Sequence, residues 1–171
     1  MRGQQAGFTL FELIAVTVIL GIIGVFVGIM ISTGASGSLT ARIAEENAQK
    51  GQIALERISL ELRDVNGGPG ASNTAPLVTA TNIQYTTSQA SLSGTRTLAY
   101  DSANKRITIT PASGGTARTL VDGVNACTMG YGGASGTYNI TFTVSFTLTG
   151  TATPFSITVK PRNSINTPAS S

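Results

Sequence analysis

The chain has 171 residues, of which only 11% are charged, and its formal net charge is +3. So small and dispersed a positive charge does not support nucleic acid as a partner. The sequence has no histidine and one cysteine, Cys127, which excludes a Cys–His nucleophile, a Cys/His zinc site and an intrachain disulfide. We therefore expect no catalytic residue, no bound metal and no cofactor, and we interpret Cys127 as a small buried hydrophobic residue.

An apolar stretch near the N-terminus is long enough to cross a membrane. Between Leu13 and Ile31 no residue is charged, and only Thr17 is clearly polar. A helix of that length, at about 1.5 Å per residue, matches the roughly 30 Å hydrocarbon core of a bilayer. One carboxylate, that of Glu12, directly precedes this stretch. An ionisable group is costly there, and it therefore suggests a function.

The start of this stretch resembles the prepilin signature of the type IV filament superfamily, which includes type IV pilins and type II secretion pseudopilins. The residues that carry the resemblance are Gly7-Phe8-Thr9-Leu10-Phe11-Glu12 and the apolar run behind them. The resemblance implies a leader over residues 1–7, cleaved between Gly7 and Phe8 by a prepilin peptidase, and N-methylation of Phe8. An ordinary secretory signal or an uncleaved anchor is the alternative, but a secretory signal has a shorter apolar core closed by an Ala-x-Ala-like site.

The resemblance also assigns a role to Glu12, which is the fifth residue after the expected cut. Its carboxylate would pair with the Phe8 amino group of a neighbouring subunit and so set the register of assembly. The alternative is that Glu12 lies at the level of the lipid headgroups and merely ends the apolar run.

Residues 8–31 are predicted to form a helix that spans the membrane and later lies in a filament core. Gly21, Gly24 and Gly28 would let neighbouring helices approach closely, and Gly24-x-x-x-Gly28 is one spacing that favours this. Residues 32–38, Ser-Thr-Gly-Ala-Ser-Gly-Ser, are weak helix formers. They predict a soft joint in one long helix, with a true break as the alternative.

Helical periodicity returns over residues 32–65. Small or apolar residues recur with three-four spacing along one face, at Ala41, Ala44, Ala48, Gly51, Leu55, Ile58, Leu62 and Val65. We expect the part from Leu55 to Val65 to pack on a globular domain, and the lower part to face other helices. The charged residues between them, with Glu46–Lys50 and Arg57–Glu61 at i,i+4 spacing, are interpreted as a solvated face; a role in subunit contacts is the alternative. Residues 66–70, Asn-Gly-Gly-Pro-Gly, are predicted to end the helix.

From residue 82 the hydrophobic period changes to two, which is typical of strands with one buried face. The predicted strands are Asn82–Thr86, Arg96–Asp101, Lys105–Thr110, Ala117–Val121, Asn139–Leu148 and Phe155–Val159. The second and third should form a hairpin in which Leu98 and Tyr100 face Ile107 and Ile109. Residues 66–76, 88–95 and 130–137 are predicted to be loops.

These patterns together predict an α+β fold. A long N-terminal helix, membrane-spanning in its first half, should pack by its second half on one antiparallel β-sheet, because one-sided alternation indicates a sheet covered on a single face. Residues 66–171 would form this globular head.

Three later stretches look like minor pilins and J-type minor pseudopilins. They are Leu55–Arg63, Leu120–Val124 and Phe155–Asn163. The resemblance implies a non-enzymatic structural subunit, and a minor one, of a type IV pilus or a type II secretion pseudopilus. Its partners would be other pilins or pseudopilins, the prepilin peptidase and N-methyltransferase, and the inner-membrane assembly platform. The protein would lie in the inner membrane as a single-pass protein, and then in a periplasmic or extracellular filament.

A major pilin, or a pilin that displays a binding site as an adhesin or a DNA-uptake subunit, is the alternative function. The single cysteine argues against a major pilin, because many of these carry a disulfide-closed C-terminal loop. Six basic residues outnumber the two acids of the head, Asp101 and Asp122, and would favour a polyanion site if they clustered on one face. They are Arg96, Lys105, Arg106, Arg118, Lys160 and Arg162. The two acids fall in predicted turns, where aspartate is common for backbone reasons.

Overall fold

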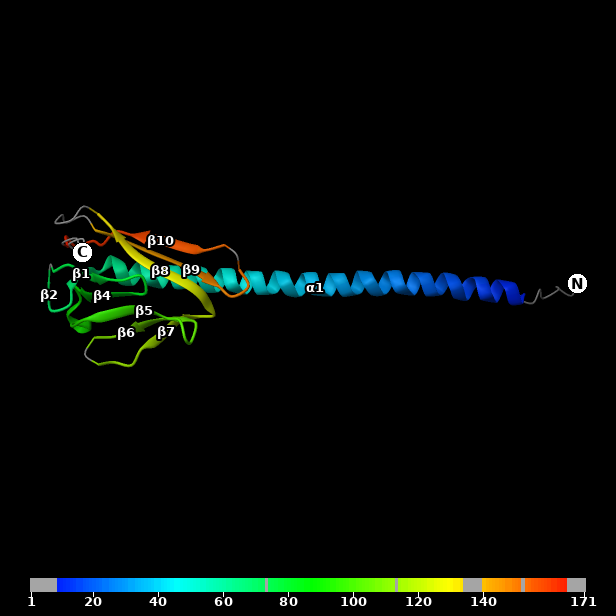
Figure 1. Cartoon of the computed structure of the whole chain (residues 1–171), viewed down its shortest axis with the longest axis horizontal. Helices are drawn as coiled ribbons and strands as arrows, with labels where there is room; N and C mark the ends of the chain where they lie inside the picture. The colour runs from blue at the N-terminus through cyan, green and yellow to red at the C-terminus, as the bar shows by residue number, and fades with distance from the viewer. Residues whose placement is uncertain (1–8, 73, 113, 134–139, 152, 166–171) are drawn as a thin grey trace, which may run out of the picture. The chain divides into compact units, whose positions relative to one another are not determined.

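The computed structural model describes residues 9–72, 74–112, 114–133, 140–151 and 153–165 (Figure 1). The chain divides into two compact units, residues 1–43 and 44–171. The described part of the first unit is helical from Leu10 onward. The second unit contains the end of the same helix and all the strands.

Helix α1 runs without interruption from Leu10 to Arg63, over 54 residues. It continues through residues 32–38, so the alternative of a true break is wrong. The side-chain hydroxyls in and just after this segment donate to backbone carbonyls of the preceding turn. Ser36 donates to the carbonyl of Ser32 at 2.9 Å, and Thr40 donates to the carbonyl of Ser36 at 3.0 Å. Such bonds to the preceding turn satisfy the side chains without ending a helix. The softness of this segment remains a prediction.

The helix ends two residues earlier than predicted, and Val65 belongs to a strand. Strand β1 (Val65–Gly68) pairs with β2 (Ala71–Ser72) and with β4 (Asn82–Thr87). The predicted loop over 66–76 therefore contains a hairpin, which turns at Gly70 with φ 99°. Gly68 is required there, because a Cβ at this position would overlap the Ala75 carbonyl. The helix ends before the Asn-Gly-Gly-Pro-Gly stretch, as predicted. The first residues of this stretch, 66–68, pair with neighbouring strands and belong to β1.

The strands form two antiparallel sheets rather than the single sheet that we predicted. One has the order β2-β1-β4-β5-β6-β7, with β3 (Leu77–Val78) also paired to β4. Its remaining strands are β5 (Arg96–Asp101), β6 (Arg106–Thr110) and β7 (Arg118–Asp122). The other sheet has the order β10-β9-β8, formed by β8 (Val124–Gly132), β9 (Thr141–Leu148) and β10 (Phe155–Val159). The chain passes from the first to the second at Gly123, whose φ of 71° suits glycine.

The predicted hairpin is confirmed in its register, because Leu98 is opposite Ile109 and Tyr100 is opposite Ile107. Strand β8 was missed. Its sequence has two glycines and no strict alternation, so only its pairing with β9 identifies it.

Two loop predictions need correction. Residues 130–132, predicted to be loop, are the end of β8, and the segment 88–95 contains a short 3-10 helix, η1 (Ala90–Leu92). Residues 134–137 of the third predicted loop, like Asn139 at the start of a predicted strand, lie outside the described residues.

The core of the second unit lies between the last turns of α1 and both sheets. Figure 1 shows the strands gathered around the C-terminal end of α1. The helix contributes Ile58 and Leu62, both fully buried as the periodicity predicted. It also contributes Ala54, which was not among the predicted positions, whereas the predicted Leu55 is only half-buried. Phe155 of β10 lies against Gly51, where a Cβ would overlap its ring. The α+β class, with a long apolar N-terminal helix and antiparallel sheets, is confirmed.

Candidate functional site

The described N-terminal segment begins with a helix cap. The side-chain oxygen of Thr9 accepts a hydrogen bond from the Glu12 N–H at 3.3 Å, and the Thr9 carbonyl accepts one from the Leu13 N–H at 3.2 Å. Thr9-x-x-Glu12 has the spacing of a capping box, a local pattern that indicates the start of a helix at this point. Gly7 and Phe8 lie outside the described residues, so cleavage and methylation there remain predictions.

Glu12 lies in the first turn of α1 and is exposed. Among the residues that the structure describes, none forms an ion pair with its carboxylate. The large hydrophobic residues between Leu10 and Ile31 are also uncovered, with 45–81% of each one exposed. The helix is long and apolar enough to cross a membrane, with a mean hydropathy of 2.9 in its most apolar window. Such a surface requires lipid or other helices to cover it.

The three glycines of this segment are open to close approach from outside. A Cβ at Gly21, Gly24 or Gly28 would meet nothing within 4 Å. Their small size is therefore not required by contacts within the described part of the chain. Packing against other helices remains the predicted use of these positions.

Further along α1, a partly buried ion pair connects the helix to the larger sheet. Glu61 accepts from the Arg96 guanidinium at 2.7 Å and from the Tyr85 hydroxyl at 3.0 Å. Burial, and then the Glu61 charge, raise the pKa of Tyr85, so this hydroxyl stays protonated and donates. The interpretation of Glu61 as part of a solvated face is therefore wrong, because its carboxylate binds two side chains of the sheet. Its partner Arg96 comes from β5, 35 residues away, beyond the range of helical spacing rules.

A second ion pair attaches α1 to the head. Lys50 donates to Asp122 of β7 at 2.9 Å, and its predicted partner Glu46 is at 4.0 Å. Because Lys50 donates to it, the pKa of the Asp122 carboxyl lies below its ordinary value. Asp122 therefore connects strand to helix in addition to ending a strand.

Residues 161–163, Pro-Arg-Asn, are part of the resemblance to minor pilins, and they bind the C-terminal end of α1 and the start of β1. The Arg162 N–H donates to the Arg63 carbonyl at 2.9 Å. The Asn163 amide donates to the Val65 carbonyl at 3.0 Å. The last carbonyls of a helix have no partner within it, so the Arg162 N–H satisfies a group of α1 that would otherwise need water. The Asn163 amide attaches the first residue of β1 to the same stretch. No local sequence pattern indicates this contact, because nearly one hundred residues separate the partners.

The basic residues of the head do not all remain available for a polyanion. Arg96 is bound by Glu61, and Arg106 is bound by Asp101 at 3.0 Å. Asp101 also accepts from the backbone and side chain of Asn104. These bonds, the Asn104 ones above all, lower the pKa of the Asp101 carboxyl. Asp101 therefore stabilises a turn, as predicted. Because Arg96 and Arg106 are bound by carboxylates, the six basic residues do not form one free cluster for a polyanion.

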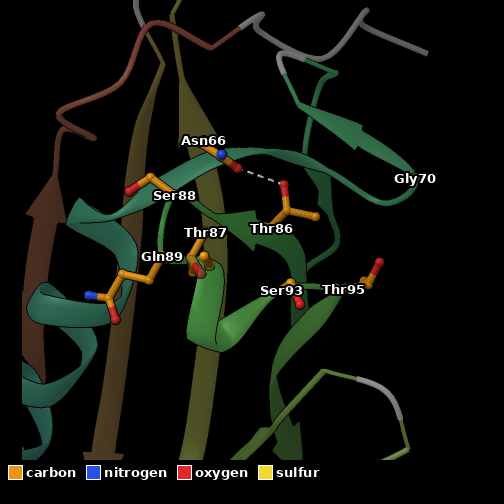
Figure 2. Close-up of a pocket in the computed structure, with 10 residues that line it drawn as sticks. Asn66, Gly70, Thr86, Thr87, Ser88, Gln89, Ser93 and Thr95 are labelled. Carbon is orange, nitrogen blue, oxygen red and sulfur yellow. Dashed lines mark hydrogen bonds between the residues drawn. The ribbon is translucent and has the colours of Figure 1, made fainter.

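One open cavity of about 410 Å³ lies where β1, β4 and η1 meet (Figure 2). Its lining includes Asn66, Thr86, Ser88, Gln89 and Thr95, and the Thr86 hydroxyl donates to Asn66 at 2.8 Å. None of its ten lining residues has an ionisable side chain. Hydroxyls and amides of this kind offer hydrogen bonds but no group for acid–base catalysis near neutral pH.

Within the described residues, no group of three or more His, Cys, Asp or Glu side chains could hold a metal ion. Cys127 is buried, with 8% of the residue exposed, as interpreted from the sequence. Burial raises the pKa of its thiol to about 12.

Comparison with known proteins gives one match. Residues 2–28 match the model of a family described as the prokaryotic N-terminal methylation motif. No curated protein and no solved structure matches the chain. The matched stretch contains Gly7, Phe8, Glu12 and the three glycines of the apolar helix.

Proposed function

We propose that this chain, which carries the prokaryotic, prepilin-type N-terminal methylation motif, is a minor structural subunit of a type IV pilus or a type II secretion pseudopilus. The motif indicates a filament subunit of the type IV pilin or pseudopilin type. It also implies processing by prepilin peptidase and assembly with other pilins. Proteins of this kind are structural and generally not enzymes.

The observation that carries the proposal is the placement of Glu12. Its exposed carboxylate stands at the start of an apolar helix that the described residues leave uncovered. In our proposal residues 1–7 are a leader, and cleavage after Gly7 makes Phe8 the first residue, which is then N-methylated. Cleavage creates an amino group with a reference pKa near ~8, so this group is largely protonated at neutral pH.

Glu12 and this amine form the assembly contact. An unpaired carboxylate within an apolar bundle is costly, whereas an ion pair recovers much of the desolvation penalty. The carboxylate of one subunit meets the Phe8 amine of its neighbour, and this pairing aligns the incoming subunit. The alternative, in which Glu12 only marks the headgroup level, predicts no effect on assembly.

The remaining segments follow from this arrangement. The apolar helix over 8–31 anchors the protein in the inner membrane before assembly, and in the filament it packs against other helices through Gly21, Gly24 and Gly28. Residues 32–65 continue toward the head, which residues 66–171 form. The inner-membrane assembly platform transfers the subunit from membrane to a periplasmic or extracellular filament.

A minor role is supported by two observations on the head. One cysteine, buried in the core, provides no disulfide-closed loop of the kind that many major pilins carry. The Arg162–Asn163 stretch, part of the resemblance to minor subunits, closes the end of α1. The alternative of a DNA-uptake pilin loses support, because two of the six basic residues are held by carboxylates.

Mass spectrometry of the mature protein tests the processing step. We expect N-methyl-Phe8 as the first residue, and replacement of Gly7 by a bulky residue should leave the precursor uncut in the membrane. A mature N-terminus beyond Glu12 would remove the basis for a filament subunit.

The assembly step is tested by Glu12→Gln, with Glu56→Gln as a matched control on the same helix. Glu56 is exposed and forms no ion pair with the described residues. We expect both variants to be cleaved and inserted into the membrane, and only Glu12→Gln to be poorly incorporated into filaments. Normal incorporation of Glu12→Gln would support the headgroup alternative.

A further inference from the structure

A groove in the second unit runs between α1 and the edge strand β7. It encloses about 480 Å³. The helix contributes Ile53 and Arg57 to its lining, and β7 contributes Arg118 and Leu120. A smaller cavity of about 260 Å³ shares Ile53 and Leu120 with it and extends along β7 to Asp122. We refer to the larger cavity as the arginine groove.

The strand beside this groove has a free edge. β7 stands at one end of the strand order of the larger sheet, and within the described residues it pairs with β6 alone. Figure 1 shows it at the outer side of the strands, next to β6. The strand at the opposite end, β2, has two residues, whereas β7 has five and presents a longer row of unpaired N–H and C=O groups. Such an edge can bind an extended peptide through backbone hydrogen bonds.

Every second side chain of such a peptide would point into the arginine groove. Arg118 lies opposite Ile109 of β6, and both line the groove, so this face of the sheet continues into it. Successive side chains of a strand point to opposite faces. An added strand therefore presents alternate residues to the groove, and the groove lining decides which residue types bind.

Two free arginines favour acidic residues at these alternate positions. Arg57 and Arg118 are exposed and form no ion pair with the described residues. Of the described residues that line the groove, Glu61 alone carries a carboxylate, and it already binds Arg96 and Tyr85. Guanidinium groups bind carboxylates through paired, charge-assisted hydrogen bonds. A glutamate or aspartate of the peptide would therefore complete the charge of the groove.

The groove also has an apolar part, which favours a peptide over a nucleic acid. Ile53 is 60% exposed on the helix. Leu120 is half-buried, lies where the register between β6 and β7 shifts, and lines both cavities. An aliphatic side chain that covers them removes apolar surface from water and stabilises the complex. Nucleic-acid binding is dominated by phosphate charge and would leave this surface exposed.

We propose that the β7 edge and the arginine groove bind an extended segment of another protein, in which an acidic and an aliphatic residue stand two positions apart. The backbone of the segment pairs with β7. Its carboxylate reaches Arg57 and Arg118, and its aliphatic side chain covers Ile53 and Leu120. This inference goes beyond the filament assignment and does not depend on it, because every residue that it uses lies in the second unit.

The probe is the fluorescein-labelled peptide Thr-Glu-Thr-Ile-Thr-Glu-Thr, whose order is the same in both directions and therefore suits a strand parallel or antiparallel to β7. Fluorescence anisotropy measures its binding to the purified full chain in detergent micelles. Arg57→Glu with Arg118→Glu should weaken binding roughly tenfold or more, because carboxylates then face carboxylates. The same peptide with lysine in place of glutamate should bind this variant and not the wild-type chain.

Two modified peptides separate strand addition from charge attraction. Methylation of the threonine nitrogens removes the N–H donors of one edge of the peptide, and methylation of the other backbone nitrogens removes those of the opposite edge. Both peptides keep the charges, yet one should lose binding and the other keep it, because only one edge faces β7. As a matched control on the protein, Lys160→Glu with Arg162→Glu makes the same charge change outside the groove and should leave binding unchanged. Circular dichroism checks that each variant keeps its fold.

The proposal is overturned if no saturable binding occurs up to about 1 mM peptide, or if both methylated peptides bind equally well. It is also overturned if the control variant weakens binding as much as the groove variant, because the attraction is then non-specific. Displacement of the peptide by duplex DNA at equal concentration would instead identify a polyanion site. Cleavage after Gly7 is measured separately, so failure of the groove leaves the filament assignment untouched.

Discussion

Replacement of Ile58 by alanine tests whether α1 covers the sheets as the fold requires. Ile58 is fully buried in the core between the helix and both sheets. The change removes three carbons, each worth about 0.8 kcal/mol when buried, or about 2.4 kcal/mol of transfer free energy. The unfilled cavity adds to this, and the better helix propensity of alanine subtracts a few tenths. We expect the free energy of unfolding to fall by about 3 kcal/mol.

Urea titration of the full chain in detergent measures this loss, followed by tyrosine fluorescence because the sequence has no tryptophan. Leu60→Ala is the matched control: Leu60 lies two residues further along, on another face of α1, and is 60% exposed. Leu60→Ala should change the free energy of unfolding by no more than about 0.5 kcal/mol, as most surface substitutions do. An Ile58→Ala loss of that same small size would refute the packing of this face on the sheets.

Three further predictions concern contacts of the head. Gly51→Ala should lower the free energy of unfolding by up to about 2 kcal/mol, because the overlap of the added Cβ with the Phe155 ring costs about 1–3 kcal/mol and the better helix propensity of alanine offsets about 1 kcal/mol; urea titration measures it. Arg96→Met should lower the free energy of unfolding by about 3 kcal/mol, because it leaves the partly buried Glu61 carboxylate without its ion-pair partner. In the double variant with Glu61→Leu, urea titration should show a smaller loss than the sum of the two single losses. At pH 8 the native Cys127 thiol should react with iodoacetamide far more slowly than after unfolding, because burial raises its pKa from 9.0 to about 12; alkylation followed by mass spectrometry measures both rates.

Short-range patterns in the sequence predicted the elements whose signals are local. The apolar run behind Glu12 defined the membrane-length helix, and the three-four spacing of Ile58 and Leu62 identified the face that packs on the sheets. Strict alternation located β9, and the short link between β5 and β6 set their register. In each case the period of the backbone, 3.6 residues in a helix and two in a strand, appears directly in the order of side chains.

The prepilin-type motif also belongs to what the sequence determined, because its meaning depends on spacing along the chain. Gly7, Phe8 and Glu12 stand at fixed distances from the apolar run, and residues 2–28 match the family on sequence alone. The structure adds that Glu12 is exposed in the first turn of α1 and that Thr9 caps this turn.

Only the tertiary structure decided the contacts between distant segments. The division into two sheets follows from the change of direction at Gly123, and β8 is recognisable only through its pairing with β9. Arg57 lies four residues before Glu61, the spacing of a helical ion pair, but Glu61 binds Arg96 and Arg57 stays exposed. A partly buried carboxylate binds the partner that the fold brings within hydrogen-bond distance, and in this chain that partner is distant in sequence.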